Sequence, residues 1–125
     1  MEKILLDTNF LLAVFELKID IFAEIARVCD FPYTLFILDR TLEEVENLIK
    51  SSLLSKRQVA KWALQLIKIK KIQILPTHDL RSVDDILVDM DGSIVATNDV
   101  VLKRRLRQKG MQILTIRQKK YVILE

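Results

Sequence analysis

The sequence predicts an α/β fold in three layers, with helices on both faces of a central, mostly parallel sheet of about five strands. Short apolar runs alternate along the whole chain with longer segments of helical periodicity, as strands joined by crossover helices do. Only two Gly and two Pro occur among the 125 residues, so long irregular loops are not expected. The length and the lack of a repeat or linker predict a single domain over residues 1–125.

The expected strands are short and are either continuously apolar or rich in β-branched and aromatic residues, as buried parallel strands are. They are expected at residues 4–6, 34–38, 72–75, 94–96 and 111–116, with a short edge strand at 121–124. A turn at Phe31-Pro32-Tyr33 precedes the second strand, and Pro76 ends the third.

The expected helices lie between the strands, and most begin at a polar residue that can cap them. In chain order they begin at Asp7-Thr8, Asp20, Asp39 or Thr41, residue 55, Ser82 and Asp99. The helix at residues 55–70 has an apolar stripe that includes Trp62, which we expect in the core. Gly92 and Gly110 follow the last two helices, where a left-handed cap is expected.

Several classes of protein are disfavoured by composition. No apolar run approaches the ~20 residues of a membrane span, and the strand-like N-terminus lacks a signal-peptide layout. The single Cys29 is expected to be a buried small hydrophobe, which fits a reducing cytoplasm. A glycine-rich phosphate loop is excluded, and the single His78, expected at the surface, excludes a histidine zinc site and disfavours a Ser-His-Asp triad.

The charges are segregated along the chain although the net charge is only +3. Residues 47–78 contain seven Lys or Arg and no Asp or Glu, and residues 100–124 contain eight and none. A basic surface beside an acidic pocket suits a polyanion held over a metal site. The alternative is that these segments are solvated helix faces of a lysine-rich protein.

Four acidic groups stand next to expected strand ends or helix starts: Asp7, Glu43-Glu44, Asp84-Asp85 and Asp99. Ligands of an open parallel sheet bind at the carboxyl ends of its strands. If the first and fourth strands are neighbours, all four groups meet at that edge. Four converging carboxylates cannot all stay ionised without a cation, and Mg²⁺ or Mn²⁺ prefers oxygen ligands. The pattern therefore indicates phosphodiester chemistry.

Each acid also has a purely structural explanation. Asp7, Asp84 and Asp99 occupy helix N-termini, where a carboxylate contributes roughly 0.3–2 kcal/mol by capping and by the helix dipole. The pairing of Asp7 and Asp99 behind buried strands favours a site, because an unpaired charge there is costly. Short polar groups that could orient these carboxylates or a bound water flank them: Thr8, Asn9, Thr97 and Asn98.

These motifs resemble those of the PIN domain family, over the whole chain. The family's hallmark is a strand that ends in Asp-Thr-Asn, and here Asp7-Thr8-Asn9 follows residues 4–6. Its second acid is a Glu on a helix, for which Glu44 is the best match and Glu43 the second choice.

The third acid of the family opens a helix, and Asp84 matches it ahead of Asp85. This helix is shorter than the family pattern, so the register of these two acids stays open. The fourth acid lies in a Val-Ala-Thr-Asn-Asp motif before a basic helix, which residues 95–99 and 102–106 match closely.

The resemblance implies a PIN-like fold and a Mg²⁺- or Mn²⁺-dependent endoribonuclease. Asp7, Glu44, Asp84 and Asp99 would be its metal ligands and catalytic residues, with support from Glu43 and Asp85. On the basic helix, phosphates would be positioned without reading of the bases by Lys103, Arg104 and Arg107.

The segment from residue 112 to residue 120 looks like that of archaeal relatives near the rRNA-processing nucleases and the VapC-type toxins. RNA processing is the first expectation. The alternatives are a toxin ribonuclease held by an antitoxin protein, and a catalytically inactive PIN-like RNA-binding module. RNA is the expected partner, together with an antitoxin or an RNA-processing complex, and an exposed apolar helix face would allow a homodimer. A receiver-type signalling domain is disfavoured, since residues 47–78 contain no Asp.

Overall fold

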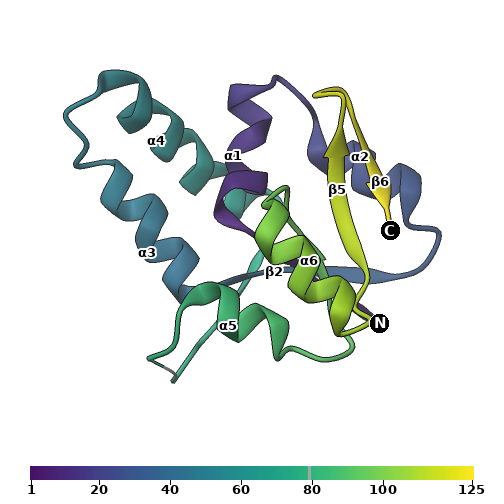
Figure 1. Cartoon of the computed structure of the whole chain (residues 1–125). Coiled ribbons are helices and arrows are strands. Elements are labelled where there is room, and N and C mark those ends of the chain that lie inside the picture. The colour runs from purple at the N-terminus through teal and green to yellow at the C-terminus, as the bar shows by residue number, and fades with distance from the viewer. Residues whose placement is uncertain (79) are drawn as a thin grey trace.

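The computed structural model describes residues 1–78 and 80–125. They form three layers, with a mostly parallel sheet between two layers of helices (Figure 1). Across the sheet, the strands lie in the order β3 (Gln73–Leu75), β2 (Tyr33–Leu38), β1 (Glu2–Leu6), β4 (Ile94–Ala96), β5 (Ile113–Arg117) and β6 (Tyr121–Leu124). All neighbours pair in parallel except β6, which runs antiparallel to β5. The predicted α/β class and parallel sheet are confirmed, and the edge strand raises the sheet to six strands.

Helices cover both faces of this sheet (Figure 1). In the described residues they are α1 (Thr8–Glu16), α2 (Ile21–Val28), α3 (Asp39–Leu48), α4 (Leu54–Ile69), α5 (Val83–Val88) and α6 (Val100–Gln108). One core joins α1, α2 and part of α4 to the sheet, and a second core joins α5 and α6 to its other face. A third cluster packs α3 against α1 and α4 through Val45, Leu12 and two alanines of α4. None of the helices described is long and apolar enough to cross a membrane.

Strand β1 is the central element of the fold because both of its faces are buried. Ile4 and Leu6 enter the core under α1 and α2, while Leu5 enters the core under α5 and α6. The strand pairs in register with β2 on one side and with β4 on the other, where Leu6 lies opposite Ala96. The first and fourth strands are therefore neighbours and end together, as the convergence of the acids requires.

The prediction that Trp62 belongs to the core is wrong, since 46% of it is exposed. The buried face of α4 consists of smaller residues, Ala60, Ala63 and Ile67. Alanines allow α4 to lie close to α1 and α3. With this face of the helix turned inward, Trp62 lies on the outer side. Cys29 is buried and His78 is exposed, as predicted.

The predicted cap of α3 is also wrong, since its N-cap is Leu38, whose side chain makes no capping hydrogen bond. Asp39 is instead the first residue of the helix, and its carboxylate holds the segment that follows β3. Its Oδ2 accepts a hydrogen bond from Thr77 N at 2.9 Å, and its Oδ1 accepts one from Thr77 Oγ1 at 2.7 Å. This contact fixes the carboxyl ends of β2 and β3 to each other.

The Asp39 contact makes stability depend on pH in a defined direction. Hydrogen bonds from the Thr77 side chain and backbone hold the pKa of Asp39 below its ordinary value. A lowered pKa stabilises the fold above the unfolded-state pKa of about 3.9, and that stabilisation is lost as pH falls through the folded-state pKa. Asp39→Ala should therefore lower Tm at neutral pH, and the gap to the parent chain should close in acid.

Thermal melts of both chains across this pH range test the prediction. Asp30→Ala, at an exposed residue after α2, is the matched control and should change Tm little at any pH. A gap for Asp39→Ala that stays constant down to the acid end would contradict the assignment.

Candidate active site

Asp7 and Asp99 leave neighbouring strands and are joined through the buried side chain of Thr97. Asp7 N continues the β1–β4 ladder by donating to Ala96 O at 3.0 Å. Thr97 Oγ1 donates to Asp7 Oδ2 at 2.8 Å and accepts from Asp99 N at 3.1 Å. One hydroxyl thus fixes the first acid and the backbone of the second at the carboxyl edge of the sheet.

Both acids also cap the helices that follow them. Asp7 Oδ1 accepts from Thr8 N at 2.9 Å, and Asp99 Oδ1 accepts from Leu102 N at 2.9 Å. Capping therefore occupies one oxygen of each carboxylate.

Asp84, at the start of α5, completes a group of three carboxylates. It is half-buried, and burial raises its pKa, followed by the negative charges of Asp7 and Asp99. Arg105 acts in the opposite direction but does not cancel these effects. Three acids from two strand ends and one helix start are therefore close enough to repel one another.

The adjacent Asp85 points elsewhere. Its Oδ1 accepts a hydrogen bond from Arg105 Nη2 at 2.7 Å, which ties α5 to α6, and this contact lowers its pKa. The geometry therefore favours Asp84 over Asp85 as the third acid of the site.

Glu44 lies on α3 and is not part of the group formed by Asp7, Asp84 and Asp99. It lines a groove of about 600 Å³ between α1, α3 and α4, together with Thr8 and Asn9, the two residues that follow Asp7. Glu43 is not among the residues that line this groove. The geometry thus favours Glu44 over Glu43 as the second acid, because Glu44 lines a groove that reaches the start of α1, next to Asp7.

The donor set suits a hard divalent cation held partly through water. Within residues 1–78 and 80–125, no three Asp, Glu, His or Cys side chains form a ready-made metal cage. The convergent donors are nonetheless all carboxylate oxygens, and a bound cation would offset the repulsion between their negative charges. Mg²⁺ usually takes only one or two carboxylates directly and keeps several waters. Neighbouring carboxylates without a closed cage fit that mode of binding.

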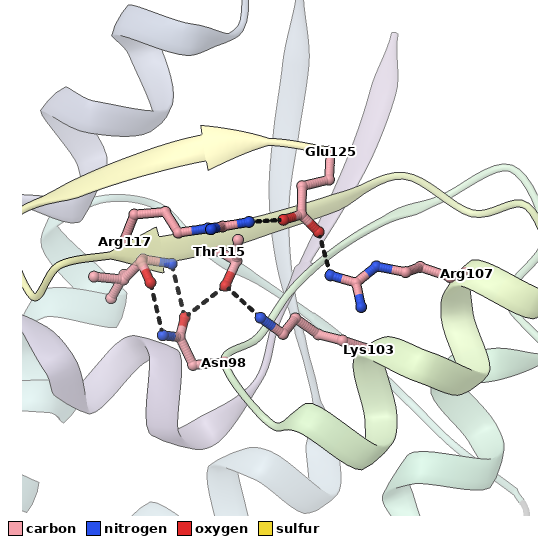
Figure 2. Close-up of polar contacts among 7 residues, drawn as sticks. Asn98, Lys103, Arg107, Thr115, Arg117 and Glu125 are labelled. Carbon is pink, nitrogen blue, oxygen red and sulfur yellow. Dashed lines mark hydrogen bonds and ion pairs between the residues drawn. The ribbon is translucent and has the colours of Figure 1, made fainter.

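Asn98 lies between Thr97 and Asp99, and its side chain acts as a strand partner of β5 that holds this segment in place (Figure 2). Its Oδ1 accepts from Ile116 N at 2.8 Å, and its Nδ2 donates to Ile116 O at 3.0 Å. Strand β5 continues past the end of β4, so this amide satisfies backbone groups that β4 no longer reaches. The sequence marked Asn98 as a supporting residue but gave no sign of its partner.

The basic residues of α6 differ in how free they are. Lys103 Nζ donates to Thr115 Oγ1 at 3.2 Å (Figure 2). Arg104, in contrast, is exposed. Arg107 Nη2 lies 2.7 Å from Glu125 Oε2. A phosphate would therefore compete with Glu125 for Arg107, a contact that the sequence did not reveal.

Glu125 also pairs with Arg117 at 2.7 Å (Figure 2). The two arginines lower the pKa of Glu125, so it stays ionised at neutral pH. Glu125 thus partly neutralises the positive charge of residues 100–124.

Comparison with known proteins assigns the family. Residues 4–119 match the model of a PIN-like domain, so the chain belongs to that family. It is 35% identical to Ribonuclease VapC4 of Methanocaldococcus jannaschii, over 97% of this chain and 95% of that protein. It is 27% identical to Ribonuclease VapC9 of Archaeoglobus fulgidus, over 95% and 86% of the two chains.

A solved structure gives the same result at the level of the fold. The PIN domain endonuclease Utp24 superposes with a TM-score of 0.78 and 28% identity, covering 98% of this chain and 90% of that one. The predicted resemblance to PIN domains is confirmed.

Removal of the Asn98 amide should loosen the site without unfolding the chain. Asn98→Ala leaves the backbone groups of Ile116 without their partner, at an expected cost of about 1–3 kcal/mol. Denaturant unfolding measures this loss, and amide hydrogen exchange at Ile116 should become faster. Asn9→Ala, at an exposed residue of α1, is the matched control. Unchanged exchange at Ile116 would contradict the role given to Asn98.

Proposed function

We propose that this chain is a metal-dependent ribonuclease that hydrolyses RNA phosphodiester bonds at Asp7, Glu44, Asp84 and Asp99. The observation that carries the proposal is the coupling of Asp7, Asp84 and Asp99 at one edge of the sheet. Its support from relatives is that two similar proteins are named ribonucleases and a third is named an endonuclease.

Mg²⁺ or Mn²⁺ is the proposed cofactor, and the four acids would hold it directly or through water. Such an ion lowers the pKa of a bound water and stabilises a leaving oxygen at phosphorus. The chain's own contribution is orientation: Thr97 holds Asp7 and the backbone of Asp99, while Asn98 anchors the loop between them.

The RNA backbone would lie over the start of α6. Asp99 is the N-cap of this helix, so Lys103 and Arg104 follow the acid within about one turn. They and Arg107 would position phosphates without reading bases. Support for this part comes from the charge pattern, since residues 100–124 contain no acid.

Two biological roles fit this chemistry. RNA processing is the first, and the likeness to the PIN domain endonuclease Utp24 supports the endonuclease chemistry that either role would need. The second is a toxin ribonuclease with an antitoxin partner, which the 35% identity to VapC4 across nearly the whole chain supports.

Expression of the chain alone separates these roles. Growth arrest that Asp99→Asn relieves would identify a toxin, whereas normal growth with active protein would favour RNA processing.

Loss of either bridged acid should abolish cleavage. Asp7→Asn and Asp99→Asn keep one oxygen for capping but lose the charge. We expect rates to fall at least about 100-fold, because changes to even the outer partners of a metal ion typically cost 10–100-fold. A metal-titrated RNA cleavage assay measures the effect, and circular dichroism confirms the fold. Cleavage that survives in both variants would rule out this site.

The two acids of α5 should behave differently. Burial and its neighbours raise the pKa of Asp84, so its charge at neutral pH opposes folding in the absence of a cation. Asp84→Asn should therefore raise Tm in metal-free buffer and reduce both the Tm gain from Mn²⁺ and the rate of cleavage. Asp85→Asn is the matched control: it removes the contact to Arg105 and should lower Tm, with the Mn²⁺ response retained.

The reverse pattern, in which the Asp85 variant loses the Mn²⁺ response and the Asp84 variant keeps it, would exchange the two roles.

A further inference from the structure

A second hollow lies on the α1–α4 side of the molecule, away from the acids. Its volume is about 550 Å³, and it is walled by the later parts of α1 and α4 and the start of α2. Three aromatic residues line it, Phe15, Phe22 and Trp62, and the rings of Phe15 and Trp62 have centroids 5.7 Å apart and planes inclined by 34°. We call it the Trp62 bowl.

Two lysines line the same bowl. Lys70 Nζ lies 5.2 Å from the centroid of Phe22, and Lys18 lines the hollow at the end of α1. Aromatic rings combined with cations are the components with which proteins bind single-stranded nucleic acid, because bases stack on the rings and phosphates meet the cations. Trp62 has the exposure that stacking needs, since nearly half of it faces solvent.

The charge around the bowl favours a polyanion. Trp62 and Lys70 belong to the segment of residues 47–78, which carries seven basic residues and no acid. Asp20 also lines the bowl, but its Oδ1 accepts a hydrogen bond from Ala23 N at 3.1 Å as the cap of α2. A second copy of the chain suits the bowl less well, because a two-fold interface would bring Lys18 and Lys70 towards their own copies.

The bowl is also aligned with the candidate active site. The groove that contains Glu44 is lined by α1 along its length, from Thr8 to Glu16, and by the first part of α4, whereas the bowl is lined by the end of α1 and the later part of α4. Val59 lines the groove and Trp62 lines the bowl, and residues three apart are neighbours on a helix surface. From Asp7 to Phe15 the chain rises by about 12 Å at 1.5 Å per residue. One RNA strand could therefore occupy both.

We propose that the Trp62 bowl binds a single-stranded segment of the RNA substrate, with a base stacked on Trp62 and adjacent phosphates at Lys18 and Lys70. The inference rests on the proposed function in taking RNA as the ligand. It adds a binding site for the uncleaved part of the strand, which the acids do not touch.

Trp62 is the only tryptophan of the chain, so its fluorescence reports on the bowl directly. The titration uses the Asp99→Asn chain in metal-free buffer with a short single-stranded oligoadenylate, so that cleavage does not interfere. Stacking should quench the fluorescence in a saturable way. Polyphosphate, which has the charge without bases, should leave it unchanged. Absence of quenching by the oligonucleotide, or equal quenching by polyphosphate, would overturn the proposal.

Variants connect the signal to the residues. Fluorescence anisotropy of a labelled oligoadenylate should show Kd raised roughly 5- to 140-fold in Trp62→Ala, the loss expected for one stacked base. Trp62→Phe should retain most of the affinity. Lys18→Ala and Lys70→Ala should each reduce the salt slope of binding by about 1. Leu54→Ala is the matched control, at an exposed apolar residue of the same helix that does not line the bowl.

Unchanged binding by Trp62→Ala would refute the site. Sedimentation tests the competing occupant: a dimer of the parent chain that Trp62→Ala dissociates would assign the bowl to a second copy instead.

This test is separable from that of the proposed function. If Asp99→Asn abolishes cleavage but Trp62→Ala changes neither RNA binding nor KM, the proposed nuclease function stands and the RNA site in the bowl is overturned. Quenching of Trp62 fluorescence by RNA, together with no cleavage by the parent chain in the presence of Mg²⁺ or Mn²⁺, would support the RNA site in the bowl and overturn the proposed nuclease.

Discussion

The site depends on the in-register parallel pairing of β1 with β4. Both strands are buried, and Leu6 lies opposite Ala96, so the chain leaves the two strands at the same level of the sheet. The first residue of each exit loop is then fixed, because Asp7 N reaches Ala96 O and Thr97 Oγ1 reaches the Asp7 carboxylate. A shift of one residue in this register would move Asp7 to the other face of the sheet. The hydrophobic core therefore sets the geometry of a polar site that it does not touch.

Much of this arrangement was predictable from local patterns. The continuous apolar runs before Asp7 and Thr97 marked buried strands, and burial on both faces is a property of parallel sheets. Strand ends and helix caps are local features, so the sequence predicted the position of Asp7 and Asp99 well. It also predicted the short edge strand at residues 121–124, which forms β6, while the antiparallel direction of that strand is known only from the structure.

The errors have a common cause in contacts between distant segments. Helical periodicity places Trp62 on the apolar stripe of α4, but the structure buries only Ala60, Ala63 and Ile67 of that helix and leaves Trp62 nearly half exposed. The sequence predicts a cap at Asp39 or Thr41, but the Asp39 carboxylate instead binds Thr77, 38 positions along the chain. The register of Asp84 and Asp85 was left open by the sequence. Arg105, 20 positions away, pairs with Asp85 and leaves Asp84 facing the other acids.

From the sequence alone, capping and metal binding are alternative explanations of Asp7 and Asp99, but the structure makes the two roles compatible. Helix capping uses one oxygen of each carboxylate, and the second oxygen of Asp7 also accepts from Thr97 Oγ1. An ionised carboxylate has about four lone-pair sites, so both acids retain acceptor capacity. The helix N-terminus also stabilises the negative charge, by roughly 0.3–1 kcal/mol at exposed positions. Burial and the negative charges of Asp7 and Asp99 raise the pKa of Asp84, so the repulsion within the group is expressed at this acid. The unrelieved negative charge at Asp84 is therefore the feature of this pocket that favours the binding of a cation.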